Sequence, residues 1–214
     1  MTPNQQLATL NAAVCEVAFD NLTRQLYATD ASVYQIEPLA VAFPASAHEA
    51  SAIIQAAAQA GVPVIPRGAG TGLSGGAIGD GLVVDFARYN RLIYDLNLER
   101  KTVRVGAGVV LDQLNDFLHP HKLCFGPDVA TSSRATLGGM IANDSSGAHA
   151  PVYGTTADHI SLLEILTSDG RVEIIGSGQN SLPRQRDLLE GLTSLNELQI
   201  VERFPGNGST LRTP

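Results

Sequence analysis

The stretch that decides the fold is Pro66-Arg67-Gly68-Ala69-Gly70-Thr71-Gly72-Leu73-Ser74-Gly75-Gly76-Ala77-Ile78-Gly79-Asp80-Gly81. Seven of these sixteen residues are glycine. Because glycine loses more backbone entropy on ordering than other residues, we expect neither a helix nor a central strand here. A backbone with so few side chains lets N–H groups approach phosphate oxygens, and Arg67 adds a planar fork of donors. The stretch predicts a pyrophosphate cradle for a nucleotide cofactor, with a mobile surface loop as the alternative.

Upstream of the cradle, the pattern predicts a strand–helix–strand unit. Ser46 and Glu49 have the spacing of a capping box at the start of an alanine-rich helix, and Gly61 supplies the stop. The predicted elements are a helix at 5–18 with an apolar stripe of Leu7, Leu10, Val14 and Val17, a strand at 39–43, a helix at 47–60, and a strand at 62–65 that Pro63 places at an edge or a strand start.

The residues after the cradle separate the nucleotide-binding folds. Residues 70–75 match G-x-G-x-x-G, but that dinucleotide fingerprint requires a helix directly after the loop. Gly76 and Gly79 disfavour a helix and residues 82–86 have the pattern of a strand, so we interpret the match as accidental. No Gly-Lys-Ser/Thr follows, which excludes a P-loop. The cradle is therefore expected between two strands.

A second region, residues 126–154, is rich in hydroxyls and glycines. Residues 136–142 could form a short helix whose N-terminal hydroxyls and amides face a ligand. The other elements predicted downstream of the cradle are a hairpin of 93–97 and 102–105, a helix at 110–118, a hairpin of 160–167 and 171–175, a helix at 184–198 and a disordered end at 205–214.

Composition excludes several classes of protein. The chain has 214 residues, 44% of them hydrophobic and 16% charged, as in ordinary globular proteins. Its net charge of −7 argues against binding of nucleic acid or anionic lipid, so local amides must hold an anionic cofactor. Cys15 and Cys124 form no CxxC, and we find no signal peptide or membrane-spanning run. We expect a cytoplasmic protein.

Taken together, the two glycine regions resemble a known family. Residues 66–76 are similar to the pyrophosphate loop of the vanillyl-alcohol oxidase, or PCMH-type, FAD-binding domain. Pro127-Asp128, residues 132–143 and Tyr153-Gly154-Thr155 resemble its second flavin-contacting segment, and residues 27–32 resemble the opening of such proteins. The most similar group is that of FAD-linked D-lactate dehydrogenase and glycolate oxidase, particularly members fused to an iron–sulfur module. The likeness covers residues 25–204.

The resemblance implies an α+β fold of two lobes with FAD between them. The implied parts are an N-terminal helical segment at 1–36, a first FAD lobe with the pyrophosphate loop at 37–108, an incomplete second lobe at 109–204 and a disordered tail at 205–214. The family would continue with a Gly-Ser-x-Gly-Thr-Leu-Gly segment and a substrate cap. Residues 206–211 echo that segment only faintly, so we expect a chain truncated before both parts.

The resemblance also implies the cofactor site. Main-chain amides of residues 68–74 would hold the pyrophosphate, and the second region would line the flavin and ribityl side. The implied FAD-binding residues are Arg67, Gly68, Ala69, Gly70, Thr71, Gly72, Leu73, Ser74, Pro127, Asp128, Ser132, Ser133, Thr136, Gly138, Gly139, Ala142, Asn143, Gly147 and Gly154. Some relatives attach flavin through a His or Cys in the first loop. Residues 66–81 contain neither, so we expect non-covalent FAD. We assign no catalytic base and no metal site.

Two functional hypotheses of different class follow. The first is the FAD part of an oxidoreductase that oxidises a D-2-hydroxy acid (D-lactate, glycolate or D-2-hydroxyglutarate) and passes electrons to an acceptor protein or iron–sulfur module. The second is a non-catalytic, truncated FAD-binding module that needs a partner chain or a missing C-terminal domain. Flavin subunits of molybdenum hydroxylases and UDP-N-acetylmuramate dehydrogenase rank lower, because they lack the Ser-Ser-Arg-Ala-Thr-Leu-Gly-Gly pattern of residues 132–139.

Several polar side chains near these regions have two interpretations. His119-Pro120-His121 has no third ligand nearby, so a polar loop is favoured over a metal site. His149 and His159 flank the second region, where packing or surface roles are favoured over contact with the flavin. Asp128 could bind a cofactor hydroxyl or cap a turn, and Tyr153 could pack beside the cofactor or in the core.

Overall fold

A computed structural model describes residues 1–176 and 179–180 of the chain. They belong to two compact units. The first contains residues 1–160 and 166–172, and the second is described at residues 161–165, 173–176 and 179–180. The helix predicted at 184–198 and the disordered end predicted at 205–214 lie outside the described residues. The lobe boundaries after residues 36, 108 and 204 stay predictions.

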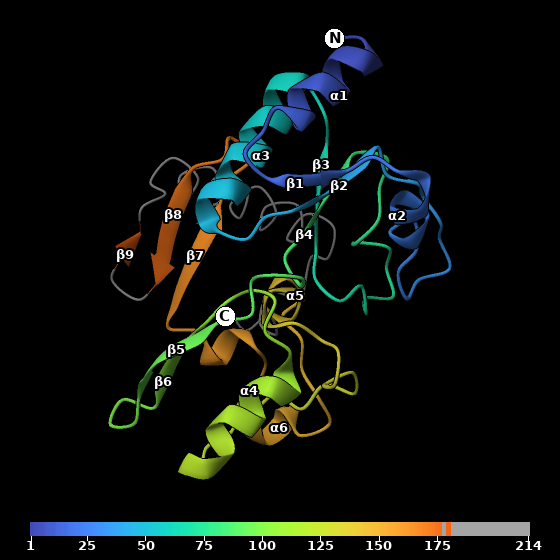
Figure 1. Cartoon of the computed structure of the whole chain (residues 1–214). Helices are drawn as coiled ribbons and strands as arrows, with labels where there is room; N and C mark the ends of the chain where they lie inside the picture. The colour runs from blue at the N-terminus through green and yellow to red at the C-terminus, as the bar shows by residue number, and fades with distance from the viewer. Residues whose placement is uncertain (177–178, 181–214) are drawn as a thin grey trace, which may run out of the picture. The chain divides into compact units, whose positions relative to one another are not determined.

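Helices and strands alternate from α1 to β3 and then follow in blocks of strands, helices and strands (Figure 1). In chain order they are α1 (Pro3–Asn11), β1 (Glu16–Ala18), α2 (Asn21–Leu26), β2 (Ala40–Phe43), α3 (Ala47–Ala60), β3 (Val64–Arg67), β4 (Leu82–Asp85), β5 (Ile93–Asn97), β6 (Thr102–Val105), α4 (Leu111–Leu118), α5 (Leu137–Ala142), α6 (Ala150–Tyr153), β7 (Leu162–Leu166), β8 (Val172–Gly176) and β9 (Gln179–Asn180). In the described residues no helix is both long and apolar enough to cross a membrane.

A mixed four-stranded sheet carries the glycine-rich stretch. Its strand order is β1-β2-β4-β3, with β2, β4 and β3 parallel and β1 antiparallel to β2. All residues of the two central strands are buried. Both central strands are therefore apolar almost throughout, as a strand covered on both faces requires. Strand β3 lies at an edge of the sheet and begins directly after Pro63, in agreement with both positions that Pro63 predicted.

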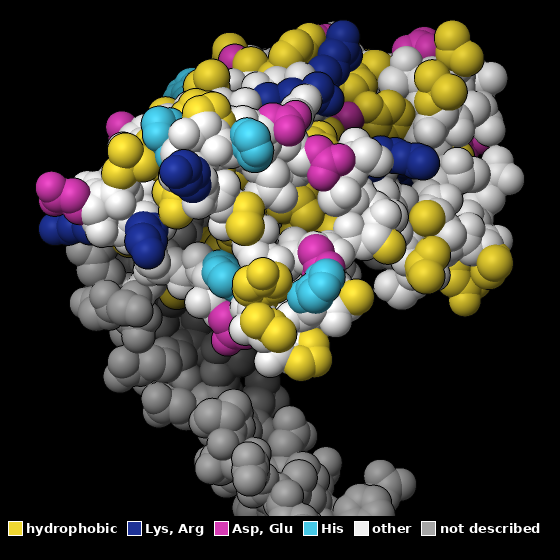
Figure 2. Space-filling model, turned by 90° about the horizontal axis from the view of Figure 1, so that it is seen from below, with side chains coloured by type: hydrophobic (Ala, Val, Ile, Leu, Met, Phe, Trp, Pro, Cys, Tyr) yellow, Lys and Arg dark blue, Asp and Glu magenta, His cyan; other side chains and the backbone are white. Residues whose placement is uncertain are grey.

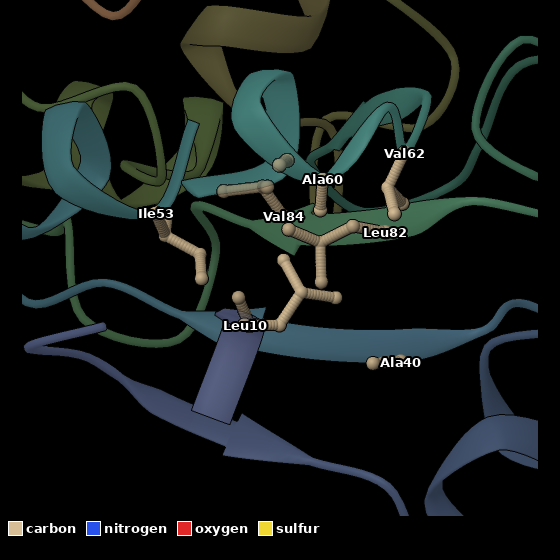
Figure 3. Close-up of a cluster of buried hydrophobic side chains, with 9 residues drawn as sticks. Leu10, Ala40, Ile53, Ala60, Val62, Leu82 and Val84 are labelled. Atoms are coloured by element: carbon tan, nitrogen blue, oxygen red, sulfur yellow. The ribbon is translucent and has the colours of Figure 1, made fainter. Parts of the chain in front are cut away.

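Two helices cover one face of this sheet and form the main core with it (Figure 3). Leu10 of α1 and Ile53 of α3 meet Leu82 and Val84 of β4, and the side chains of Leu10, Ile53 and Leu82 are fully buried. The opposite face buries a smaller cluster around Val83, against which Tyr27 packs. The sheet thus has apolar cover on both faces.

Helix α3 confirms the prediction at both of its ends. The Ser46 hydroxyl accepts a hydrogen bond from the Glu49 amide at 3.2 Å, and Gly61 ends the helix at φ +65°. The Glu49 carboxylate accepts from the Ala45 amide at 2.9 Å, one residue before the position that a capping box would use. The helix therefore begins at Ala47, the predicted residue.

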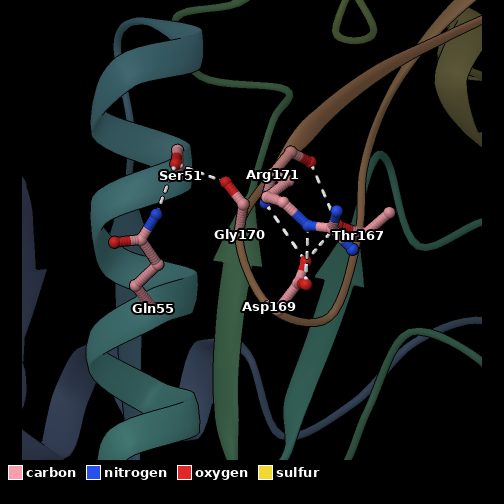
Figure 4. A network of polar contacts seen from close by, with 6 residues as sticks. All are labelled: Ser51, Gln55, Thr167, Asp169, Gly170 and Arg171. Carbon is pink, nitrogen blue, oxygen red and sulfur yellow. Dashed lines mark hydrogen bonds and ion pairs between the residues drawn. The ribbon is translucent and has the colours of Figure 1, made fainter. Parts of the chain in front are cut away.

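The same helix holds the turn between β7 and β8 (Figure 4). The Ser51 hydroxyl donates to the Gly170 carbonyl oxygen, and the Gln55 amide group donates to the Ser51 hydroxyl at 3.1 Å. Gly170 has φ +78°, and a Cβ there would lie 2.5 Å from Cγ of Gln55. Glycine is required at this position by both its conformation and its packing.

Two predicted elements in the first 65 residues were wrong in extent, and one was missed. The helix predicted at 5–18 ends at Asn11, Val14 is 70% exposed, and Glu16–Ala18 forms β1 instead. The open edge of β2 supplies a hydrogen-bonded ladder to these residues, and this pairing overrides the helical spacing. The strand predicted at 62–65 begins at Val64, because the Val62 amide bonds to the Ala57 carbonyl and completes the end of α3. Helix α2, six residues long, was not predicted.

A second cluster of buried residues joins α4 and α5 to the β5–β6 hairpin. Leu111 and Leu114 of α4 pack with Leu137 and Met140 of α5, and Ile93 of the hairpin contacts them. The hairpin has the predicted bounds, and α4 begins one residue later than predicted. This core places the start of α5 beside the start of α4.

Candidate functional site

The glycine loop, defined here as residues 68–81, connects β3 to its neighbour β4. Because these strands are parallel, the loop must return from the carboxyl end of β3 to the start of β4. No helix forms in the loop or directly after it. The predicted position of the loop between two strands is confirmed, and so is the absence of the helix that the dinucleotide fingerprint requires.

The amides of the loop are free. Within the described part of the chain, none of the backbone N–H groups of residues 68–76 donates a hydrogen bond to another protein group. The row ends at Ala77, whose amide donates to Asp30 at 3.4 Å. Backbone donors are almost always paired in folded proteins, by protein, water or ligand. A run of nine free amides (residues 68–76) offers a row of hydrogen-bond donors to anionic oxygens.

The loop glycines fall into two groups by what surrounds them. A Cβ at Gly68 would lie 2.2 Å from the Thr136 hydroxyl oxygen, and one at Gly81 would lie 2.1 Å from the Pro63 carbonyl oxygen. Gly72 and Gly76 have no protein atom within 4 Å of that position, and neither has a positive φ. Packing within the described chain therefore explains glycine at 68 and 81, but not at 72 and 76.

The first and second glycine regions meet at Thr136. Its side chain is 3% exposed, and its hydroxyl has no hydrogen-bond partner among the residues that the structure describes. This hydroxyl lies against Gly68 of the loop, and a Cβ at Gly139 of α5 would be 3.3 Å from it. An unpaired buried hydroxyl costs about 1–3 kcal/mol, and this one lies against Gly68, the first residue of the row of free amides.

Backbone pairing fixes Thr136 in this position. The Leu137 amide donates to the Val109 carbonyl at 2.8 Å, and the Leu111 amide donates to the Ala135 carbonyl at 3.0 Å. Gly138 donates to the Ala107 carbonyl at 2.9 Å and packs so closely on that residue that a Cβ would lie 2.8 Å from the Ala107 Cβ. The helix predicted at 136–142 is confirmed as α5, with Thr136 at its N-cap but without a side-chain cap bond.

The remaining predicted residues of the second region lie around and beyond α5. Ala142 and Asn143 are exposed, and the Asn143 side chain donates to the Gly139 carbonyl at 2.9 Å. Ser132 is half-buried, with its amide bonded to the Val129 carbonyl, and Ser133 is exposed.

Asp128 is engaged within the second region itself. Its carboxylate accepts from the ring Nδ1 of His149 and, at 3.2 Å, from the His149 amide. The side-chain hydrogen bond from His149 lowers the pKa of Asp128. A Cβ at Gly147 would lie 2.1 Å from Oδ1 of Asp128, and Pro127, which precedes it, is buried. These contacts show that Asp128 stabilises a turn, and its contact with a cofactor hydroxyl stays a prediction.

The histidines and Tyr153 have protein partners too. The His159 ring packs on Phe125 with centroids 5.3 Å apart, and its Nε2 lies 2.7 Å from the Tyr153 carbonyl oxygen. Tyr153 is 48% exposed, so it is not a core residue. Gly154 has φ +77°, and a Cβ there would lie 2.3 Å from the Asp158 carboxylate.

Sequence reasoning missed the part that residues 27–34 play at the loop. The Ala31 amide donates to the Gly70 carbonyl at 2.9 Å, and Arg67 donates to the Thr29 carbonyl at 2.9 Å and to the Ala77 carbonyl at 3.0 Å. The sequence of residues 27–32 indicates only a family resemblance. No local pattern indicates that an N-terminal segment contacts a loop some 40 residues away, and only Asp30 and Ser32 stand out as typical turn residues.

Positively and negatively charged side chains are mixed on the surface of the protein seen in Figure 2. On the face seen in Figure 2, Lys and Arg side chains lie among Asp and Glu side chains and do not gather into one basic patch. The chain as a whole has a net charge of −7. An anionic ligand at the glycine loop is therefore held by local amides and not by a long-range field.

With this geometry established, three comparisons bear on the site. The family model described as "FAD binding domain" matches residues 38–176. The D-2-hydroxyglutarate dehydrogenase of Haemophilus influenzae is 40% identical over 183 residues, which are 84% of this chain and 17% of that protein. The glycolate oxidase subunit GlcD of Escherichia coli (strain K12) is 34% identical over 148 residues, 68% of this chain and 30% of that protein.

A solved structure supports the fold. Wild-type BBE-like 1 of Physcomitrella patens matches with a TM-score of 0.72 at 22% sequence identity, over 84% of this chain and 39% of that one. The likeness confirms the α+β fold that the family resemblance implied. The chain spans well under half the length of each protein that it matches here.

Proposed function

The chain belongs to the FAD binding domain family, and from this premise we propose that it is the FAD-binding part of a flavin-dependent oxidoreductase that oxidises a D-2-hydroxy acid. The two relatives named above are called after 2-hydroxyglutarate and glycolate, which share a hydroxyl on the carbon next to a carboxylate. A third substrate of this class, D-lactate, has the same arrangement.

The observation that supports a cofactor at this place is the row of free amides at residues 68–76, which begins at Gly68 beside the buried, unpaired hydroxyl of Thr136. The residues present fit FAD, because a pyrophosphate accepts several N–H bonds at once and a flavin offers polar edges to a hydroxyl. We propose that the amides of residues 68–74 hold the pyrophosphate oxygens.

The second region supplies the other side of the proposed site. Small residues there let the backbone approach the cofactor, and hydroxyls and an amide offer hydrogen bonds. The residues proposed to line the flavin and the ribityl chain are Ser132, Ser133, Thr136, Gly138, Gly139, Asn143 and Gly147. When bound, FAD would supply a two-electron acceptor, and this chain's residues bind it, orient it and exclude water from it.

We assign no residue of this chain as the base that takes the substrate proton. Electrons removed from the 2-hydroxy acid would pass from the flavin to an acceptor protein or an iron–sulfur module. Absence of His and Cys from residues 66–81 supports a non-covalent cofactor.

The test is reconstitution of the purified chain with FAD. Retention of flavin absorbance after gel filtration is expected, and release of all the flavin into the supernatant on acid precipitation is expected for a non-covalent cofactor. A yellow pellet would contradict dissociable binding, and failure to retain any flavin would contradict the cofactor proposal itself.

Substrate class is tested on the same sample without oxygen. Loss of the flavin absorbance on addition of D-2-hydroxyglutarate, D-lactate or glycolate would support the enzyme proposal. A chain that keeps FAD but is bleached by dithionite alone would instead be a binding module that lacks the substrate-binding part.

A further inference from the structure

Arg67 was expected to face the cofactor, but its guanidinium is bonded inside the protein. Nη1 donates to the Ala77 carbonyl at 3.0 Å, and Nη2 donates to the Thr29 carbonyl at 2.9 Å. The group also lies 5.1 Å from the centre of the Tyr27 ring. The planar guanidinium of Arg67 thus connects the start of the glycine loop to Ala77 within the loop and to residues 27–34.

Residues 27–34 hold the loop at three further points. Gly70 accepts from the Ala31 amide, and the Ala77 amide donates to the Asp30 carboxylate, whose other oxygen accepts from the Ser32 amide at 2.8 Å. A Cβ on Gly75 would lie 3.0 Å from the ring of Tyr34. These contacts use loop carbonyls, the amide of Ala77 and packing, and they leave the amides of residues 68–76 free.

The contacting segment is itself anchored in the core. The Tyr27 hydroxyl donates to the Asp85 carboxylate at the end of β4, and its ring packs edge-on against Phe43 with centroids 5.8 Å apart. Burial, followed by the hydrogen bond and charge of Asp85, raises the pKa of Tyr27, so its hydroxyl remains a donor at physiological pH. The Asp85 side chain also accepts from the amides of Ala87 and Arg88.

We infer that residues 27–34 and Arg67 form a clamp that holds the glycine loop in its binding conformation before the cofactor arrives, with Arg67 as a positioning residue and not a phosphate ligand. The inference rests on the proposed function, because the conformation held is the one proposed to bind pyrophosphate. A loop with this many glycines would otherwise lose much entropy on binding, and pre-ordering it raises affinity.

The first test uses the cofactor-free chain and hydrogen exchange at the amides of Ala31 and Ala77. Arg67→Lys keeps the charge but loses the fork, and Arg67→Met loses both. The clamp predicts that both variants exchange these amides about tenfold faster or more, while the Val83 amide in the sheet is unchanged. Arg104→Met is the matched control, since Arg104 is an exposed arginine that pairs with Asp95 in the β5–β6 hairpin.

The second measurement is FAD affinity. The clamp predicts that Arg67→Lys and Arg67→Met weaken it to a similar extent, about tenfold or more. The inference would be overturned if neither variant changed the exchange of these amides in the cofactor-free protein, while Arg67→Lys kept near-normal FAD affinity and Arg67→Met lost it. That pattern would indicate direct contact between Arg67 and a phosphate.

The Asp30→Ala variant distinguishes loss of the clamp from a simple change of charge. It also tests the clamp if the Arg67 variants fail to fold. Removal of a carboxylate near an anion site should strengthen anion binding by charge alone. The clamp predicts weaker FAD binding, with faster exchange at Ala77; stronger binding would contradict it. If the wild-type chain binds no FAD, the proposed function fails, while exchange at Ala31 and Ala77 still tests the clamp.

Discussion

At the scale of single residues, Thr136 and the loop glycines have properties that the described chain does not explain by itself. A fully satisfied core would pair the Thr136 hydroxyl, and a purely structural loop would keep glycine only where a Cβ clashes or φ is positive. The first departure lies where the two glycine regions meet, and the second lies within the glycine loop, at Gly72 and Gly76. Strain or unpaired groups of this kind are typical of binding sites.

Thr136→Val is expected to stabilise the cofactor-free chain and to weaken FAD binding. Replacing an unpaired buried hydroxyl by a methyl group should raise the free energy of unfolding by about 1 kcal/mol. Denaturant unfolding and FAD titration measure the two effects. Thr156→Val is the matched control, because Thr156 is equally buried but its hydroxyl donates to the Ser145 carbonyl at 2.6 Å. Thr156→Val should lower the free energy of unfolding by about 1 kcal/mol. The same decrease in Thr136→Val would refute the argument.

Gly72→Ala should mainly lower FAD affinity, whereas Gly68→Ala should mainly lower the stability of the fold. A methyl group at 72 meets open space, so stability should change by less than about 0.5 kcal/mol while FAD affinity falls. A methyl group at 68 meets the Thr136 hydroxyl oxygen at 2.2 Å and should cost about 1–3 kcal/mol of stability. Thermal unfolding without cofactor and flavin titration distinguish the two. Wild-type affinity in Gly72→Ala would show that the ligand does not approach this residue.

At the scale of elements, α3 connects local sequence signals to the site. Its cap starts it at Ala47, its inner face packs on the sheet that carries the glycine loop, and Ser51 and Gln55 hold the β7–β8 turn. The strand–helix–strand unit could be predicted because capping and stopping signals are local. Strand β1 could not, because its partner β2 lies more than 20 residues away and offers an edge that no helical periodicity reveals.

Removal of the cap is expected to lower stability without altering the binding site. Ser46→Ala removes the acceptor of the Glu49 amide and should cost about 1 kcal/mol. Ser46→Asp keeps an acceptor and should stay near wild type. FAD affinity, measured well below the unfolding temperature, should be equal in both variants. A large drop in affinity for Ser46→Ala would mean that α3 controls the loop conformation more directly than its contacts indicate.

At the scale of the whole molecule, the described chain brings two distant glycine regions into contact within one compact unit. Residues 27–34 add a third segment to the same place. A ligand bound there would contact all three of these segments. Its binding energy should therefore appear as global stability.

FAD is expected to raise the thermal unfolding temperature of the chain in proportion to the logarithm of its concentration. At a hundred times the dissociation constant, the stabilisation is about 2.7 kcal/mol, which corresponds to roughly 5–10 °C for a domain of this size. Differential scanning fluorimetry with an extrinsic dye measures the shift. Riboflavin is the control because it lacks the pyrophosphate, and it should shift the transition far less. An equal shift with riboflavin would argue against the amides of the glycine loop as the main binding groups.

The sequence by itself determined the elements whose causes are local. Ser46 and Gly61 bounded α3, the alternation of Ile93–Asn97 and Thr102–Val105 predicted their hairpin, and the glycines after Thr71 excluded a Rossmann helix. The family resemblance, carried by two long motifs, predicted FAD binding, and the family match confirms it.

Only the tertiary structure decided how Arg67 is used, that residues 27–34 contact the loop, and that the Thr136 hydroxyl lies unpaired against Gly68. Apart from the hydrogen bond between Arg67 and Ala77, these contacts join residues about 35 or more positions apart. Capping, turn and periodicity signals act through neighbours within a few residues, whereas a guanidinium or a hydroxyl bonds to whichever group the folded backbone places beside it. That placement is a property of the packed sheet and helices, and no short stretch of the chain contains it.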